Sequence, residues 1–310
     1  MGNKVTVVGS YNVGLFLKGD RLPVKGETVI GDAFHEGGGG KGSNQAVAAS
    51  MFGANTIFVG RIGSDKYGED ALAMYQRLGI STEFISIDQS IHSGISVIII
   101  DRTGANLISV VPGANFRLSP TDIDCAEKAM RESALVGFQL ENRLETVTYA
   151  IGKARALGAR VLLDPAPAVP LPTEVLAQLD YIKPNETEAS IVTGISVTDV
   201  ASAETAGRWF VERGVGTAIV TLGEAGAVVT TAEGSCHYPA PRIDAVDTTG
   251  AGDVFSGALM AALAGDKPVE DAVRFANHAA ALSGTKLGVI ESIPTLEEVH
   301  EFMTRCGAEV

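Results

Sequence analysis

Short apolar runs alternate with amphipathic stretches along most of the chain. The apolar runs are rich in β-branched residues and include "KVTVVG", "NTIFVG" and "TAIVTLG". Stretches of helical spacing, such as "RLETVTYAIGKARALG", lie between them. Buried strands separated by helices of about 10–15 residues indicate βαβ units around a parallel sheet. The pattern predicts an α/β fold that binds its ligands at the carboxyl ends of the strands.

Two segments, at about residues 13–36 and 94–112, interrupt this alternation. Both are typical of extended chain joined by turns, and "DRTGAN" in the second predicts a hairpin turn between two strands. They form either a small separate sheet, a lid over the main sheet, or an extension of the main sheet, and periodicity alone favours neither. Since no linker or repeat divides the chain, we expect one domain over residues 1–310 with these segments inserted in it.

Composition and charge narrow the class of protein. The 310 residues are 45% hydrophobic and 20% charged, with a formal net charge of −13. Nucleic acid and anionic membranes require basic surfaces, so neither is expected as a partner. No apolar run reaches the roughly 18 residues of a membrane helix, and no signal peptide is recognised. Cys125, Cys236 and Cys306 lack CxxC spacing, which fits a reducing compartment, so we expect a cytoplasmic protein.

The first glycine-rich segment is "HEGGGGKGSNQAVAA", and a helical pattern begins near Ser43. A phosphate-binding P-loop needs Ser or Thr directly after its lysine, whereas Gly42 follows Lys41 here. Glycines 37–40 would instead let the backbone approach a small ligand, to which Lys41 and Asn44 offer hydrogen-bond donors. The alternative is a flexible loop with a solvated lysine.

The second segment is "AVDTTGAGDVFSGAL", in which small residues precede an amphipathic helix. A helix N-terminus of this kind favours an anion, yet Asp253 would repel one. Phosphoryl transfer explains both features: the amides hold the transferred group while Asp253 accepts the proton of the attacking hydroxyl. The alternative, a helix cap, leaves the glycine cluster unexplained. No second strand with an acidic residue follows, which argues against a dinucleotide site.

Together, "GGKGSNQAVAA" and "DTTGAGDVFSGAL" resemble the ribokinase family of carbohydrate kinases, also called the PfkB family. The resemblance covers nearly the whole chain and includes "PGANFRLSP", "DPAPA" and "KPNETEA". It implies transfer of the γ-phosphoryl group of ATP to a sugar or nucleoside hydroxyl, with Mg²⁺ and a monovalent cation, here K⁺. It also implies a mostly parallel sheet sandwiched by helices, and a small β-sheet lid that pairs two subunits into a homodimer.

The resemblance assigns roles to matching residues. Asp253 is the implied general base, beside an anion hole made by Gly250, Ala251 and Gly252. The positions that match the sugar site are Asn12, Gly40, Lys41, Asn44 and Glu141.

Further positions match the nucleotide and metal sites. Those on the nucleotide side are Asn185, Thr221, Gly223, Gly226 and Asn277. Glu188 is implied at the Mg²⁺ site, through water. The positions that match a K⁺ loop, largely through backbone carbonyls, are Asp247, Thr249, Ser283, Lys286, Gly288 and Ser292.

One position departs from the family pattern. Ribokinases carry an aspartate two residues after the asparagine that matches Asn12, and Gly14 stands there in this chain. Because that carboxylate grips ring hydroxyls, its absence predicts poor use of D-ribose and favours a deoxysugar, a ketose, a bulkier sugar or a nucleoside. The leading hypothesis is a kinase acting on the primary hydroxyl of a pentose or related sugar. A nucleoside kinase and a non-catalytic sugar- or nucleotide-binding relative are the alternatives.

Overall fold

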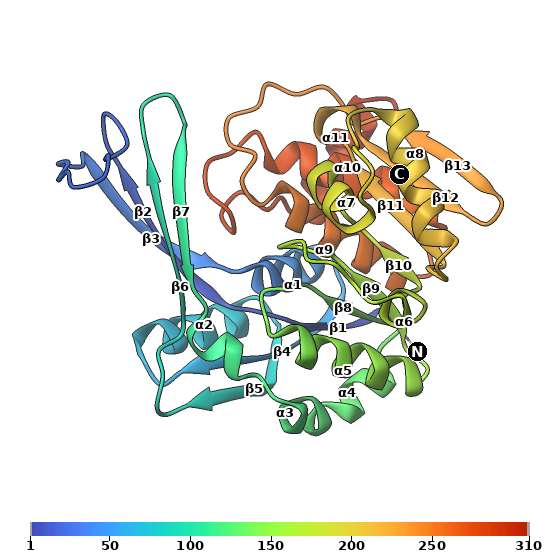
Figure 1. Ribbon diagram of the computed structural model, residues 1–310, viewed down its shortest axis with the longest axis horizontal. Helices are drawn as coiled ribbons and strands as arrows, with labels where there is room; N and C mark the ends of the chain where they lie inside the picture. The colour runs from blue at the N-terminus through green and yellow to red at the C-terminus, as the bar shows by residue number, and fades with distance from the viewer. Residues whose placement is uncertain (1, 309–310) are drawn as a thin grey trace.

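The computed structural model describes residues 2–308, in which two β-sheets are found (Figure 1). The larger sheet has nine strands in the order β13-β12-β11-β10-β9-β8-β1-β4-β5. In chain order these strands are β1 (Lys4–Val8), β4 (Asn55–Gly63), β5 (Ser81–Asp88), β8 (Leu135–Phe138), β9 (Arg160–Leu163), β10 (Tyr181–Ile182), β11 (Thr217–Thr221), β12 (Ala227–Thr231) and β13 (Gly234–Tyr238).

The larger sheet is mostly parallel, as the sequence predicts. All neighbours from β5 to β11 pair in parallel, and only β12 and β13 are antiparallel at one edge. Strand β1 is an inner strand, with Val5 opposite Thr56 of β4 on one side and Leu135 of β8 on the other. The carboxyl ends of the seven strands from β5 to β11 therefore meet at one edge of the sheet, where β13 also ends.

Helices cover both faces of the larger sheet. One face carries α1 (Lys41–Met51), α2 (Lys66–Arg77), α9 (Ala251–Ala264), α10 (Val269–Ser283) and α11 (Leu296–Arg305). The other carries α3 (Pro120–Cys125), α4 (Glu127–Glu132), α5 (Leu144–Ala156), α6 (Thr173–Leu176), α7 (Glu186–Thr193) and α8 (Val200–Val211). Alternate strand residues point to opposite faces, so Val7 and Val8 of β1 enter different cores. The result is the helix–sheet–helix sandwich expected from the motifs.

The second sheet, here called the lid sheet, has the strand order β3-β2-β6-β7. Its strands are β2 (Asn12–Lys18), β3 (Ala33–Gly39), β6 (Gly94–Ile100) and β7 (Asn106–Val111). Strands β6 and β7 form the hairpin predicted at "DRTGAN". Figure 1 shows the lid sheet projecting from the left of the larger sheet. Because it shares no strand pairing with the larger sheet, it is a separate lid rather than an extension.

Two 3₁₀ helices complete the elements, η1 (Gly113–Arg117) after the lid sheet and η2 (Gly223–Ala225) after β11. Over residues 2–308, each helix is too short or too polar to cross a membrane.

Candidate active site

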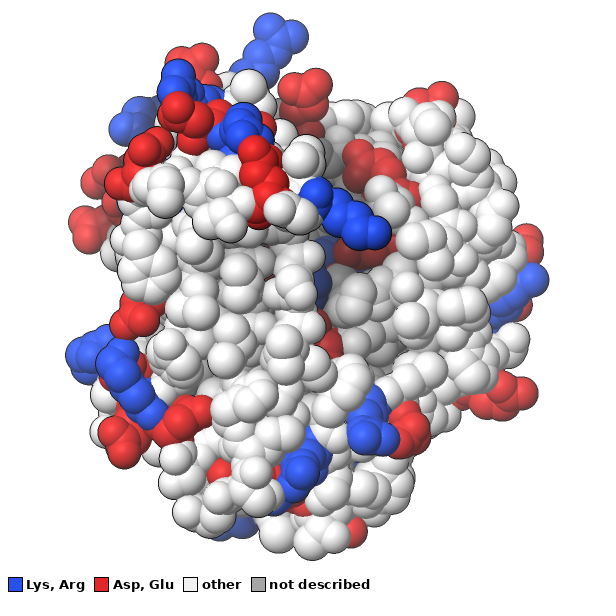
Figure 2. Space-filling model, turned by 60° about the vertical axis from the view of Figure 1, so that its left-hand side comes forward, with Lys and Arg blue, Asp and Glu red and all other residues white. Residues whose placement is uncertain are grey.

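Polar residues from several strands converge at the carboxyl edge of the larger sheet. Glu141 follows β8, Asp164 follows β9, Lys183 follows β10, and Thr221 ends β11. Crossover connections leave this edge of a parallel sheet open to ligands. A cavity of about 180 Å³ lies here, lined by Lys41, Asp164, Lys183, Asn185, Glu188, Thr221, Gly250, Gly252 and Asp253. Figure 2 shows one face of the molecule hollowed, with acidic and basic side chains inside the hollow.

The helix α9 begins at this cavity. Gly250 precedes it with φ +81°, and a Cβ there would lie 2.7 Å from Cγ1 of Val289, so only glycine fits. Gly250 and Gly252 line the cavity, whereas the amides of Ala251 and Asp253 donate to the carbonyls of Thr248 and Gly250. Of the four residues predicted to form the anion hole and the base, Gly250 and Gly252 thus line the cavity with their backbone.

The carboxylate of Asp253 is buried and does not cap its own helix. Its Oδ2 accepts a 2.8 Å hydrogen bond from Nδ2 of Asn44, and its Oδ1 accepts one of 3.1 Å from Nε2 of Gln45. Both donors lie on α1, which packs so closely on α9 that a Cβ at Gly257 would be 2.4 Å from Ala48. The helix-cap interpretation of Asp253 is therefore wrong for this structure, because its carboxylate is held by α1.

A buried ion pair forms the floor of the cavity. Nζ of Lys183 lies 2.8 Å from Oδ2 of Asp164 and 3.3 Å from the carbonyl oxygen of Gly252. Gln45 and Ser256 also donate to Oδ2 of Asp164, each at 2.9 Å. Neither Asp164 nor Lys183 is among the site residues predicted from the sequence. The one feature of the sequence that points to this ion pair is that Asp164 and Lys183 each directly follow a buried apolar run.

Three polar atoms in this region are buried without a hydrogen-bond partner among the described residues. They are Oδ1 of Asp164, Oδ1 of Asn44 and Oε1 of Gln139. A buried acceptor left unpaired is costly, so such atoms are suited to a bound ligand or water.

Charged side chains lie close together at the cavity and shift the pKa values of Lys41 and Glu188. The carboxylate of Asp253 raises the pKa of Lys41 above its usual range, against the opposing effect of burial. Burial raises the pKa of Glu188, and the nearby Asp164 raises it further. Glu188 also forms a capping box with Asn185: its amide donates to Oδ1 of Asn185, and its carboxylate accepts from the amide of Asn185.

The residues predicted at the sugar site lie together where β1 leads into the lid sheet. Oε2 of Glu141 accepts from the amide of Lys41 at 2.9 Å, from the hydroxyl of Ser10, and from Nδ2 of Asn12 at 3.4 Å. Gly40 has φ +90°, and a Cβ there would lie 2.7 Å from the amide nitrogen of Asn12. This tight turn brings Asn12 and the start of α1 side by side.

Gly14 lies beyond Asn12 on the same side of β2, since successive side chains of a strand alternate. A Cβ at Gly14 would lie 2.7 Å from Cε2 of Phe16, so the Phe16 ring covers this glycine. The ring also lies beside the imidazole of His35 of β3, tilted by 35° with ring centroids 5.9 Å apart. An aromatic ring therefore closes the place where the family pattern has a carboxylate.

The residues predicted on the nucleotide side are more dispersed. Thr221 lines the cavity, while Gly223 begins η2 with φ +52° and Gly226 follows it with φ +94°. Asn277 is buried in α10, and its amide donates to the carbonyl of Tyr238 at 3.0 Å. Its side chain thus already has a partner within the protein.

The residues predicted at the cation site bring two loops together beside α9. Oδ1 of Asp247 accepts from the amide of Thr249, and its Oδ2 from the amide of Gly288. Ser283 and Ser292 are buried, and Lys286 directs its ammonium to Glu298. The described residues hold no cluster of three His, Cys, Asp or Glu side chains suited to a metal.

Known proteins match this chain over nearly its full length. The model of the pfkB family of carbohydrate kinases matches residues 3–296. A ribokinase from Staphylococcus aureus is 38% identical over 303 residues, covering 97% of this chain and 100% of the relative. A deoxyribokinase from Salmonella typhi is 36% identical over 301 residues, covering 97% and 98%.

A solved structure of Arabidopsis thaliana ribokinase, complexed with ribose and ATP, superposes with a TM-score of 0.89 at 30% identity. The superposition covers 98% of this chain and 99% of that one. The resemblance inferred from the two glycine-rich segments is thereby confirmed, and so is the fold that it implied.

Proposed function

Because this chain belongs to the PfkB family of carbohydrate kinases and is an ATP-dependent sugar kinase, we propose that it phosphorylates the primary hydroxyl of a pentose. The observation that carries the proposal is the carboxylate of Asp253, buried at a helix start and held by Asn44 and Gln45. The relatives named as ribokinase and deoxyribokinase support a pentose as acceptor.

In the proposed reaction, Asp253 accepts the proton of the substrate hydroxyl. The hydroxyl oxygen forms a bond to the γ-phosphorus of ATP, while the bond from that phosphorus to the bridging oxygen breaks and ADP leaves. The backbone at Gly250, Ala251 and Gly252 receives the transferred group. The ammonium groups of Lys41 and Lys183, both at the cavity, stabilise the charge that builds on its oxygens.

The proposed sugar site consists of Asn12, Gly40, Lys41, Asn44 and Glu141. This proposal is supported by the hydrogen bonds that Glu141 accepts from Asn12 and from the amide of Lys41. Asn44 in turn donates to Asp253, which links the sugar site to the proposed base. The unpaired Oδ1 of Asn44 can accept from a sugar hydroxyl. The phosphates and base of ATP would extend from Asn185 and Thr221 toward Gly223, Gly226 and Asn277.

The donor set at the cavity fits Mg²⁺, which prefers oxygen ligands and retains several waters. Glu188 and the unpaired Oδ1 of Asp164 would hold the ion, Glu188 through water. When bound with ATP, Mg²⁺ neutralises phosphate charge.

We propose a K⁺ site in the loops of Asp247 and Gly288. The loops meet through the hydrogen bond between these residues, and Val289 packs on Gly250. A cation held there by carbonyls of Asp247, Thr249, Ser283, Lys286, Gly288 and Ser292 would favour anion binding at α9.

A homodimer through the lid sheet is supported by its exposed apolar side chains. Phe34 is 63% exposed and Ile108 60% exposed, and Leu107, Val110 and Val111 are also exposed on the edge strand β7. A partner that covers such an edge removes a surface prone to aggregation. The use of ATP and the three exposed free cysteines support a cytoplasmic location.

The test is ADP release from ATP, Mg²⁺ and K⁺ with pentoses, deoxypentoses, ketoses, hexoses and nucleosides. We expect the highest kcat/KM on a pentose or deoxypentose. Turnover confined to nucleosides would favour the nucleoside kinase. No turnover on any compound, with sugar binding seen by calorimetry, would favour the non-catalytic alternative.

A further inference from the structure

We propose that Asn115 is a positioning residue that fixes the amide of Asn12 and thereby determines how the sugar is held. Asn115 lies in η1, between the lid sheet and α3, and is 1% exposed. The inference rests on the proposed function, because it takes Asn12 as a sugar ligand. It adds a residue that does not itself reach the sugar.

The side chain of Asn115 makes three hydrogen bonds to two consecutive residues. Its Oδ1 accepts from the amide of Tyr11 at 3.0 Å. Its Nδ2 donates to the carbonyl of Tyr11 at 2.9 Å and to Oδ1 of Asn12 at 2.8 Å. Reversing this amide would set its oxygen against two acceptors, so only one orientation is compatible with the surroundings.

This orientation fixes that of Asn12. Because Oδ1 of Asn12 accepts from Asn115, Nδ2 of Asn12 faces Oε2 of Glu141. The second hydrogen of that Nδ2 group is then free to meet a sugar hydroxyl. Asn115 thus makes Asn12 a donor rather than an acceptor toward the substrate.

The backbone of η1 is held by the segment that carries Glu141. Nδ2 of Asn142 donates to the carbonyl of Asn115 at 2.9 Å, and Nε of Arg143 donates to that of Phe116 at 2.8 Å. Asn12, Asn115 and the segment of Glu141 are therefore joined by hydrogen bonds, although their positions in the chain are far apart.

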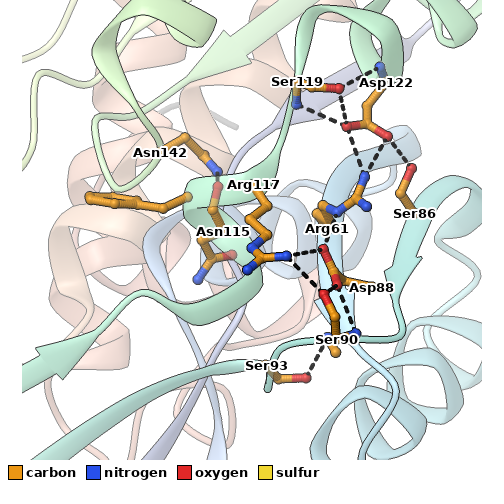
Figure 3. A network of polar contacts seen from close by, with 12 residues as sticks. Arg61, Ser86, Asp88, Ser90, Ser93, Asn115, Arg117, Ser119, Asp122 and Asn142 are labelled. Carbon is orange, nitrogen blue, oxygen red and sulfur yellow. Dashed lines mark hydrogen bonds and ion pairs between the residues drawn. The ribbon is translucent and has the colours of Figure 1, made fainter.

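A charged network fastens the other end of η1 (Figure 3). Arg117 donates to Ser90, and Arg61 lies 3.1 Å from both Asp88 and Asp122. These contacts tie η1 and the start of α3 to β4 and β5. Asn115 is consequently held by the body of the protein as well as by the first residues of the lid sheet.

The lid sheet begins against the Asn12–Asn115 pair. Gly94, the first residue of β6, pairs with Asn12 in the sheet. A Cβ at Gly94 would lie 2.0 Å from Oδ1 of Asn12 and 2.3 Å from Nδ2 of Asn115. Gly94 thus packs directly against the hydrogen bond between Asn115 and Asn12, and both of these side chains are buried.

Asn115→Asp tests this role with almost no change in shape. The new carboxylate would face Oδ1 of Asn12, so we expect the Asn12 amide to turn and present its oxygen to Glu141 and the sugar. The sugar KM should then rise about tenfold or more, while the ATP KM stays within twofold. Asn115→Ala, which removes the donor without adding charge, should raise the sugar KM in the same direction and serves if the aspartate variant does not fold.

The measurements use the full chain. The sugar is the one with the highest kcat/KM in the panel described above, which includes D-ribose and 2-deoxy-D-ribose. Thr146→Val is the matched structural control, since its hydroxyl donates only to the carbonyl of Leu118 just after η1. It should lower the melting temperature and leave the sugar KM within twofold.

A double-mutant cycle supplies the decisive comparison. If Asn115 acts through Asn12, Asn115→Asp should add less than a twofold change to the sugar KM of Asn12→Ala. An unchanged sugar KM in Asn115→Asp, an equal rise in the ATP KM, or full additivity with Asn12→Ala would overturn the inference. Absence of any sugar turnover by the unaltered protein would instead count against the proposed function.

Discussion

Asn44 donates a 2.8 Å hydrogen bond to the carboxylate of Asp253, joining the first turns of α1 and α9. The two glycine-rich segments of the sequence thus meet at one hydrogen bond. The bond orients the carboxylate into the cavity, and Gln45 holds its other oxygen. An acceptor fixed in this way is prepared to receive a proton from a hydroxyl placed beside the α9 N-terminus.

Asp253→Asn should abolish most turnover and preserve the fold. The amide keeps the shape of the carboxylate but cannot accept a proton, so kcat should fall by about 10²–10⁴-fold. ADP release at saturating sugar and ATP measures the effect. The stabilisation of the variant by ATP in a thermal melt should match that of the unaltered protein. A kcat within tenfold would rule out the general-base role.

The sequence predicted those parts of the site that depend on local chain chemistry. The glycine-rich turns at Gly40 and Gly250, where the structure has positive φ, and the carboxylate at the start of α9 belong to motifs a few residues long. Asp164 and Lys183 lie 19 positions apart and meet only because β9 and β10 are parallel neighbours. Their contact depends on strand order, which periodicity does not give.

The directions of individual side chains could not be predicted from the sequence either. Nothing in "NVGLFLK" indicates that the Phe16 ring turns back over Gly14, because a strand pattern sets only the face of each residue. Likewise, Asn277 matches a nucleotide position, yet its amide donates to Tyr238.

Lys183→Met should destabilise the protein and lower kcat. It removes the ammonium from the cavity and leaves the carboxylate of Asp164, 1% exposed, without its ion-pair partner. Breaking a buried pair in this way costs about 3–5 kcal/mol. Urea denaturation gives the stability, and Asp164→Asn/Lys183→Met should recover much of it without recovering kcat. Equal stability of Lys183→Met and the unaltered protein would show that the ion pair between Lys183 and Asp164 does not stabilise the fold.

The Phe16 ring should limit what Gly14→Asp can achieve. The new side chain would meet Cε2 of Phe16, so the ring must move before a carboxylate fits. We expect Gly14→Asp alone to change D-ribose kcat/KM little, and Gly14→Asp/Phe16→Ala to raise it several-fold over Phe16→Ala. D-ribose and 2-deoxy-D-ribose should both be assayed with the unaltered protein, the two single variants and the double variant. If the double variant gains nothing over Phe16→Ala, position 14 does not face the sugar.

Removing K⁺ should lower activity. With a bulky organic cation in its place at constant ionic strength, the proposed anion site at Gly250 would lose a neighbouring charge, and kcat should fall severalfold. Asp247→Asn should weaken the response, because Asp247 joins the two loops through Gly288. Equal rates with and without K⁺ would refute the cation site.

Acid should loosen the network that supports η1. Hydrogen bonds from Ser90, and then the guanidinium of Arg61, lower the pKa of Asp88 from 3.8 to about 2. A lowered folded-state pKa means that the folded protein binds fewer protons than the unfolded chain, so the contribution of Asp88 is complete above pH 4. It is lost as the pH falls toward 2. Asp88→Asn should therefore melt at a lower temperature than the unaltered protein near neutral pH, and the difference should close between pH 4 and pH 2. Thermal melts across that range measure the difference, with Asp271→Asn, in the exposed first turn of α10, as the control. A constant difference down to pH 2 would mean that the charge of Asp88 contributes nothing to the support of η1.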